Sequence, residues 1–265
     1  MDLGIKDRVA LVSGGSRGIG RAVAEMLAEE GCRVVVVSRR QASVDKAVEA
    51  IRQSGATVAG VAADMTDKNE VARVVAYARE TFGAPEIVVT NVHIGEGGAD
   101  GDSDFESLPD ADYFDGFNAF TMSIVYLARE VIPDMKKRNW GRIISIGSGA
   151  AKEPPKNIQH LLHNIARAPA VVLNKSLAND LGRYGITVNT IGTGWIATEA
   201  VEKFARDMNI DDMDAWVKDN FSIPMGRLGQ PREEAALVTF LASELAGFIT
   251  GNFIPVDGGD HHSAW

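Results

Sequence analysis

Short apolar runs of strand length alternate along this chain with amphipathic stretches of helix length, and this alternation restricts the fold more than any other feature. The runs are rich in β-branched residues and nearly continuous, which is typical of strands covered on both faces. They lie at Val9–Ser13, Arg33–Ser38, Val58–Ala62, Ile87–Thr90, Arg142–Ile146, Ile186–Ile191 and Asn252–Val256. Helices are predicted between them, at about 18–30, 42–54, 68–82, 111–137 and 157–181, and in stretches up to 245. Such alternation predicts an α/β fold with a doubly wound parallel sheet of about seven strands, right-handed crossovers and helices on both faces.

The size and composition fit one domain that spans residues 1–265. A chain of 265 residues with 45% hydrophobic and 24% charged residues is ordinary for a globular protein. The formal net charge of -9 argues against the basic face that nucleic-acid binders carry. The single cysteine, Cys32, excludes an intrachain disulfide, and no apolar run approaches the ~20 residues of a membrane helix. We therefore expect a soluble cytoplasmic protein with a small-molecule substrate and with neither nucleic acid nor membrane as a partner.

Two segments break the alternation. Residues 95–112 are rich in glycine and acidic residues, and the start of this segment resembles a calcium-binding loop. However, Phe105 stands where such a loop needs glycine and Ala111 where it needs glutamate, so we expect a solvated loop and no metal site. The other segment, residues 195–224, is rich in Met, Phe and Trp, which predicts a substrate lid, packed helices, or both.

A glycine-rich turn follows the first strand and opens onto the first helix. It reads Ser13-Gly14-Gly15-Ser16-Arg17-Gly18-Ile19-Gly20. Glycines let the backbone turn sharply and approach a pyrophosphate, and the helix N-terminus adds free N–H groups and the positive end of its dipole. The spacing differs from the usual fingerprint, but the position of the turn predicts a nicotinamide dinucleotide site. Its residues are Gly14, Ser16, Arg17, Gly18, Ile19 and Gly20.

The end of the second strand indicates which dinucleotide binds. In such folds a carboxylate at this point accepts a hydrogen bond from the ribose 2′-hydroxyl of NAD, whereas an arginine accommodates the 2′-phosphate of NADP. Here the strand ends in Ser38-Arg39-Arg40, with no acidic residue. Because guanidinium groups pair well with phosphate, Arg39 and Arg17 predict NADP, with NAD as the alternative.

Several sequence blocks, in order, resemble the short-chain dehydrogenase/reductase family along essentially the whole chain. The blocks are Gly14–Gly20, Ala63–Asp67, Gly141–Ile144, Tyr184–Asn189, Gly194–Glu199, Gly226–Pro231, Phe248–Gly251 and Val256–Gly259. The resemblance implies a Rossmann-like fold of seven strands and a homo-oligomer, either a homotetramer or a dimer. It also implies that Asp64 and Met65 flank the adenine and that Asn91 lies under the cofactor. By the same resemblance, Thr198 holds the carboxamide.

The predicted active site departs from the family's pattern of Asn, Ser and Tyr-x-x-x-Lys. Ser148 fits the serine, but counting back from the block that begins at Tyr184 places His163 at the tyrosine position and Arg167 at the lysine position. The asparagine position falls on Phe120. No change of register restores the motif, because none of the four tyrosines precedes a lysine by four residues. The pairs are Tyr77 and Thr81, Tyr113 and Phe117, Tyr126 and Glu130, and Tyr184 and Val188.

Histidine can replace the missing tyrosine chemically, because an imidazole exchanges protons near neutral pH. His163 and Arg167 are four residues apart and share a face if the segment is helical. Arg167 would keep the positive charge of the usual lysine and bond the cofactor's ribose, and Ser148 would hold the substrate oxygen. These residues favour an NADP-dependent oxidoreductase that acts on a carbonyl or alcohol.

Two alternatives stay open. One is a non-redox lyase, dehydratase or isomerase that uses His163 or His93 as a base, and the other is a cofactor-binding protein without turnover. A metal site made by His93, His160 and His163 is not expected, because no nearby carboxylate has ligand spacing. Pro169 lacks an N–H and its ring clashes with the carbonyl of the residue four before it, so the helix over 157–181 is predicted to break or bend near 165–169. The helices over 111–137 and 157–181 are predicted to pack against symmetry mates.

Overall fold

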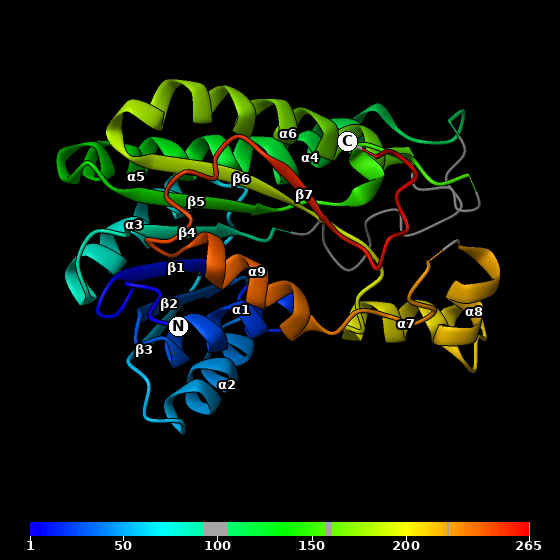
Figure 1. Ribbon diagram of the computed structural model, residues 1–265, viewed down its shortest axis with the longest axis horizontal. Coiled ribbons are helices and arrows are strands. Elements are labelled where there is room, and N and C mark those ends of the chain that lie inside the picture. The colour runs from blue at the N-terminus through cyan, green and yellow to red at the C-terminus, as the bar shows by residue number, and fades with distance from the viewer. Residues whose placement is uncertain (93–104, 157–160, 222, 265) are drawn as a thin grey trace.

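A computed structural model describes residues 1–92, 105–156, 161–221 and 223–264, and a seven-stranded parallel sheet forms its centre. The strands lie side by side in the order β3-β2-β1-β4-β5-β6-β7 (Figure 1). Their bounds are β1 Val9–Ser13, β2 Arg33–Ser38, β3 Val58–Ala62, β4 Ile87–Thr90, β5 Gly141–Ile146, β6 Ile186–Thr193 and β7 Phe253–Val256. The predicted doubly wound α/β fold of about seven strands is confirmed, with each predicted run forming a strand.

Helices cover both faces of the sheet (Figure 1). The helices are α1 Gly18–Glu29, α2 Gln41–Arg52, α3 Lys68–Thr81, α4 Asp110–Phe117, α5 Ser123–Arg138, α6 Leu161–Leu181, α7 Glu199–Asp207, α8 Met213–Asn220 and α9 Pro231–Leu241. Alternate strand residues divide between two cores, because successive side chains of a strand point to opposite faces. Val12 and Val36 pack with α1, α2 and α9, whereas Leu11 and Val37 pack with α3, α5 and α6.

The strand order reverses between β1 and β4, and this point fixes where a ligand can bind. All strands are parallel, so their carboxyl ends meet at one edge of the sheet. In open α/β sheets, ligands bind in the crevice outside the carboxyl ends at such a reversal. The glycine turn after β1 and Asn91 after β4 lie on its two sides.

The segment predicted as one long helix over 111–137 contains a π-helical turn at Asn118–Met122, between α4 and α5. Such turns widen the helix by one residue and occur often at functional sites. Phe120 lies in the middle of this turn and is buried. The π turn therefore places Phe120 beside the crevice.

The predicted break near Pro169 is wrong, because α6 runs without interruption from Leu161 to Leu181 with Pro169 inside it. Proline removes one helical hydrogen bond, to the carbonyl of Ile165. The packing of α6 along β6 and α4 stabilises the helix despite this loss. A bend in α6 stays a prediction, and the start predicted at 157–160 lies outside the described residues.

The segment predicted as a lid or packed helices, residues 195–224, contains α7 and α8. Its four aromatic rings contact one another, with ring centroids 5.1 to 5.6 Å apart. These rings belong to Trp195, Phe204, Trp216 and Phe221. The segment therefore has a small apolar core of its own, which supports the packed-helix interpretation and leaves the lid as a prediction.

Candidate functional site

The glycine turn has a backbone that only glycine can adopt. Gly14 has a φ of +61°, and a Cβ built on it would lie 2.0 Å from the backbone oxygen of Asn91. A Cβ on Gly20 would lie 2.3 Å from the Gly14 oxygen. α1 begins at Gly18 with no acidic residue in its own first turn. The Glu199 carboxylate approaches this end from α7, with its Oε2 3.7 Å from a Cβ built on Gly18. This cradle fits the phosphates of a dinucleotide.

Hydrogen bonds connect the glycine turn to the two neighbouring strands. The Asn91 side-chain amide donates to the Gly14 carbonyl at 3.3 Å, and the Asn91 N–H donates to Ser13 Oγ at 3.0 Å. On the other side, Ser16 Oγ donates to Ser38 Oγ at 3.0 Å. The turn is thus held at both sides of the strand-order reversal.

The residues predicted to select NADP lie around this turn. Arg39 follows β2 directly and is exposed, next to the Ser38 hydroxyl that bonds the turn. Arg17 is the N-cap of α1, is exposed, and gives no side-chain cap to the helix. Both arginines are therefore exposed next to the segments that the sequence assigns to the cofactor.

Three other predicted cofactor residues have defined local roles. A Cβ on Gly18 would touch the Thr198 methyl group at 3.3 Å, so the loop before α7 lies against the glycine turn. Thr198 also caps α7, its hydroxyl accepting from the Val201 N–H. The exposed Asp64 carboxylate accepts from the N–H and hydroxyl of Thr66, while Met65 is only 4% exposed and packs in the core. An adenine contact for Asp64 and Met65 stays a prediction.

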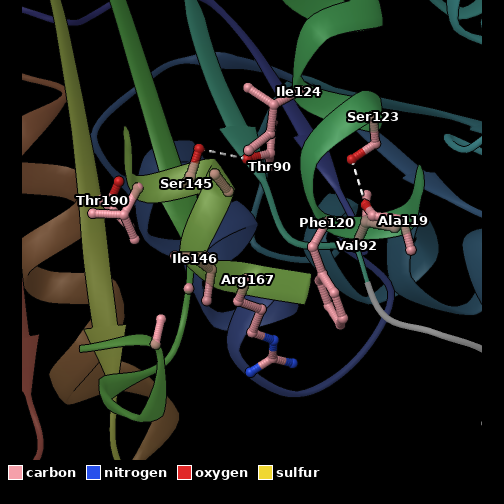
Figure 2. Close-up of a pocket in the computed structure, with 14 residues that line it drawn as sticks. Thr90, Val92, Ala119, Phe120, Ser123, Ile124, Ser145, Ile146, Arg167 and Thr190 are labelled. Carbon is pink, nitrogen blue, oxygen red and sulfur yellow. Dashed lines mark hydrogen bonds between the residues drawn. The ribbon is translucent and has the colours of Figure 1, made fainter. Parts of the chain in front are cut away.

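The three residues predicted to replace the family's asparagine, tyrosine and lysine lie in one cluster. The Phe120 ring lies 5.9 Å from the His163 ring, centroid to centroid, at 52°. The Arg167 guanidinium carbon lies 4.4 Å from the Phe120 centroid, within cation–π range. Figure 2 shows the Phe120 and Arg167 side chains next to each other at the pocket. The π turn and α6 thus bring together residues that are more than forty positions apart.

A small pocket lies between this cluster and the ends of the central strands. Arg167 and Phe120 line it together with the hydroxyls of Thr90, Ser145 and Thr190 (Figure 2). Thr90 Oγ1 donates to Ser145 Oγ at 2.9 Å, and the buried Asn174 amide donates to Thr190 Oγ1 at 2.9 Å. Sequence reasoning missed these three hydroxyls. Thr90 ends its strand and could have been noticed for that reason, whereas Ser145 and Thr190 lie within theirs.

Ser148 lies in the loop after β5, beside this pocket. Its neighbour Gly147 and the nearby Ala151 line the pocket. Its Oγ accepts a hydrogen bond from the Ala150 N–H at 3.2 Å and so caps a short helical turn, Gly149–Ala151. That bond leaves the Ser148 proton available for another acceptor.

Neither a metal site nor a membrane-spanning helix is found within the described part of the chain. No three His, Cys, Asp or Glu side chains gather there as metal ligands, and His93 and His160 lie outside it. None of the helices in the described ranges is long and apolar enough to cross a membrane.

The chain is similar in sequence and in fold to proteins that are already known. A family model described as enoyl-(acyl carrier protein) reductase matches residues 14–261. The 3-oxoacyl-[acyl-carrier-protein] reductase FabG of Pseudomonas aeruginosa is 33% identical, with 98% of this chain and 100% of the relative covered. The structure of L-sorbose reductase from Gluconobacter frateurii, complexed with NADPH and L-sorbose, matches with a TM-score of 0.91 at 30% identity, covering 99% of this chain and 100% of that one.

One further solved structure is similar over nearly the whole chain. It is the NADPH-bound structure of a short-chain oxidoreductase from Pseudomonas aeruginosa PAO1, described as containing an atypical catalytic centre. Its TM-score is 0.88 at 29% identity, covering 98% of this chain and 99% of that one.

Proposed function

The chain belongs to the short-chain dehydrogenase/reductase family, and on that premise we propose that it is an atypical, NADP-dependent oxidoreductase of a carbonyl or alcohol substrate, with His163 in the place of the usual tyrosine. The observation that carries the proposal is the pairing of an intact glycine cradle with the Phe120, His163 and Arg167 cluster at the same edge of the sheet.

The proposed cofactor is NADP. The described residues fit its phosphates: the glycine turn opens onto the N-terminus of α1, Arg17 lies in that turn, and Arg39 follows β2, whose end carries no acidic residue. Related structures were solved with NADPH bound, which supports the choice. NAD is the alternative.

The proposed chemistry assigns one task to each side chain. A nicotinamide cofactor supplies or accepts the hydride when it is bound. His163 gives a proton to the oxygen of a carbonyl that is being reduced, or takes one from an alcohol that is being oxidised. Ser148 donates a hydrogen bond to the same oxygen. Arg167 keeps a permanent positive charge near the site, because a guanidinium does not give up its proton.

Phe120 contacts both of the other residues that are predicted to differ from the family's pattern, His163 and Arg167. A neutral asparagine at this position would offer polar atoms, whereas the Phe120 ring offers an apolar face to the Arg167 guanidinium and to the His163 ring. The ring therefore packs against both polar side chains.

The proposal is tested by NADPH consumption against a panel of ketoses, cyclic ketones and 3-oxoacyl thioesters. His163→Phe removes the proton donor but keeps a ring, so the rate is expected to fall roughly 10²–10⁴-fold with little change in NADPH affinity. Ile165→Ala, at an exposed position on the same helix, serves as the control and should keep its activity. Full activity in His163→Phe would exclude His163 as the donor.

Two other outcomes would redirect the proposal. If no compound is reduced but a substrate is dehydrated, cleaved or isomerised, the non-redox alternative gains, for which the absence of a Tyr-x-x-x-Lys motif is the favourable observation. Tight NADPH binding with no turnover of any kind would favour a cofactor-binding protein.

We also propose that residues 1–265 form one domain, with residues 195–224 as the substrate lid, and that the protein is a homo-oligomer, either a tetramer or a dimer. Exposed apolar side chains on α4 and α6 support the oligomer: Phe114 is 74% exposed and Val172 is 68% exposed. Covering such side chains is favourable. Sedimentation that finds only monomer at micromolar concentration would refute it.

A further inference from the structure

The residues after β7 form a turn held by hydrogen bonds to Asp257. The Asp257 carboxylate accepts hydrogen bonds from the Gly259 N–H at 3.0 Å and from the His261 N–H at 3.1 Å. Its second contact with His261, from the ring Nδ1, measures 2.7 Å. Gly258 and Gly259 have φ values of +66° and +89°, which residues other than glycine rarely adopt. This turn reverses the chain and sends it back from the end of β7.

The turn packs against the end of the 195–224 segment and the residues that follow it. The Met225 N–H donates to the Gly258 carbonyl at 3.3 Å. A Cβ on Gly258 would lie 2.9 Å from the Ile223 Cγ2, and a Cβ on Gly259 would lie 3.0 Å from the Pro224 Cγ. The two glycines therefore permit a close contact between the tail and residues 223–225.

Beyond the turn, the tail is bound by the carboxylate of Glu153. That carboxylate accepts from the His262 N–H at 2.7 Å, from the Ser263 N–H at 3.1 Å, and from the Ser263 hydroxyl. The Ser263 hydroxyl first, and then the His262 N–H, lower the pKa of Glu153 to about 2, so the acceptor is charged throughout the physiological range. Glu153 itself belongs to the Ser148 loop, since its N–H donates to the Gly149 carbonyl at 3.0 Å.

The tail thus joins two segments that are far apart in the sequence, the end of the proposed lid and the Ser148 loop. Figure 1 shows the C-terminal trace turning at the α7–α8 end of the molecule and running back toward α4 and α6. We propose that residues 257–263, a segment we name the strap, form one wall of the substrate entrance, and that Glu153 is the positioning residue that holds this wall and so limits the size of the substrate. The inference rests on the proposed function only in taking the Ser148 side as the substrate side.

The test needs no substrate, because a cysteine introduced as Ser148→Cys reports access to the site. The native Cys32 does not interfere: it is 1% exposed, and burial raises the pKa of its thiol to about 12. The rates of alkylation by iodoacetamide and by a bulky pyrenyl maleimide are measured in this background. They are then compared with Glu153→Ala added, and with the chain truncated after Asp260.

In Glu153→Ala and in the truncated chain, which we call the strap variants, the alkylation rate with the pyrenyl maleimide is divided by the rate with iodoacetamide. This ratio is expected to rise on the order of tenfold, because hydrogen bonds to a charged acceptor are lost. Glu153→Gln keeps one acceptor oxygen and should give an intermediate ratio. Glu80→Ala removes an exposed carboxylate from α3 and should leave the ratio unchanged. An unchanged ratio in both strap variants, or no reaction of the introduced thiol in any of them, would overturn the proposal.

Hydrogen exchange checks that the variants act through the strap and not through unfolding. The His262 and Ser263 amides should be protected in the parent protein and should exchange on the order of tenfold faster in Glu153→Ala, with the β-sheet amides unaffected. If the carbonyl panel yields a substrate, Glu153→Ala should also raise kcat/KM for bulky relative to compact carbonyls, with the KM for NADPH unchanged. A panel without turnover would count against the proposed function and leave the alkylation result standing.

Discussion

Glu234, on the first turn of α9, is predicted to make the free energy of unfolding depend on pH. Its side chain has no exposed surface, and its Oε1 accepts a hydrogen bond from Thr193 Oγ1 at 2.6 Å. Its Oε2 is buried and finds no hydrogen-bond partner within the described ranges. Burial raises the pKa of Glu234 from its ordinary value of 4.5 to about 7, and the Thr193 bond offsets only part of this effect. The folded protein therefore holds Glu234 as a neutral acid below neutral pH.

The sign of the effect follows from this rise. An acid whose pKa is higher in the folded state binds its proton more tightly there, so its contribution is fully present below about pH 4.5 and is lost as the pH rises through about 7. Moving a carboxyl pKa over this interval corresponds to about 3 kcal/mol of unfolding free energy. Glu234→Gln keeps the shape and the Thr193 contact but cannot ionise, so it should lack this loss.

Urea unfolding of the parent and of Glu234→Gln, at one protein concentration and at intervals from about pH 4 to about pH 8, measures the effect. The free-energy difference between the two proteins should shift by about 3 kcal/mol in favour of glutamine over this interval. Glu80→Gln, an exchange at an exposed site, should give a curve parallel to that of the parent. If the Glu234→Gln curve also runs parallel to it, the carboxyl ionises freely in the folded state and the reasoning fails.

Two more predictions concern the cofactor and the aromatic cluster. Arg39→Ala should raise the Kd of NADPH roughly 10–100-fold and leave that of NADH unchanged, since only a charge-assisted bond to the 2′-phosphate is lost. Fluorescence titration of both cofactors measures this, with Arg52→Ala, farther along on α2, as the control; equal losses for NADPH and NADH would contradict the assignment. Trp216→Ala should destabilise residues 195–224 by about 2 kcal/mol, because it removes its ring contacts with Trp195, Phe204 and Phe221. Hydrogen exchange in α7 and α8 should rise, whereas Lys218→Ala, exposed on the same helix, should have no effect.

The helix predicted to break at Pro169 is a case in which local sequence preferences did not predict the structure. Proline disfavours a helix by its missing N–H and its ring, and both effects are local. In this chain α6 continues through Pro169, because its buried side, including Ala166 and Ala170, packs on neighbouring elements along its length. The π turn at Phe120 is a second such case, since nothing in the local sequence distinguishes it from an ordinary helix.

The sequence alone determined the sheet and the glycine turn, and it predicted the positions that differ from the family's pattern. These are properties of neighbouring residues: β-branched runs form strands covered on both faces, and only glycine permits the turn beside Asn91. Only the tertiary structure decided that Phe120 lies against both His163 and Arg167, and that the tail is bound to Glu153 more than a hundred residues earlier. Such contacts depend on where whole elements pack, and the distance between two packed side chains is not contained in the pattern of either segment.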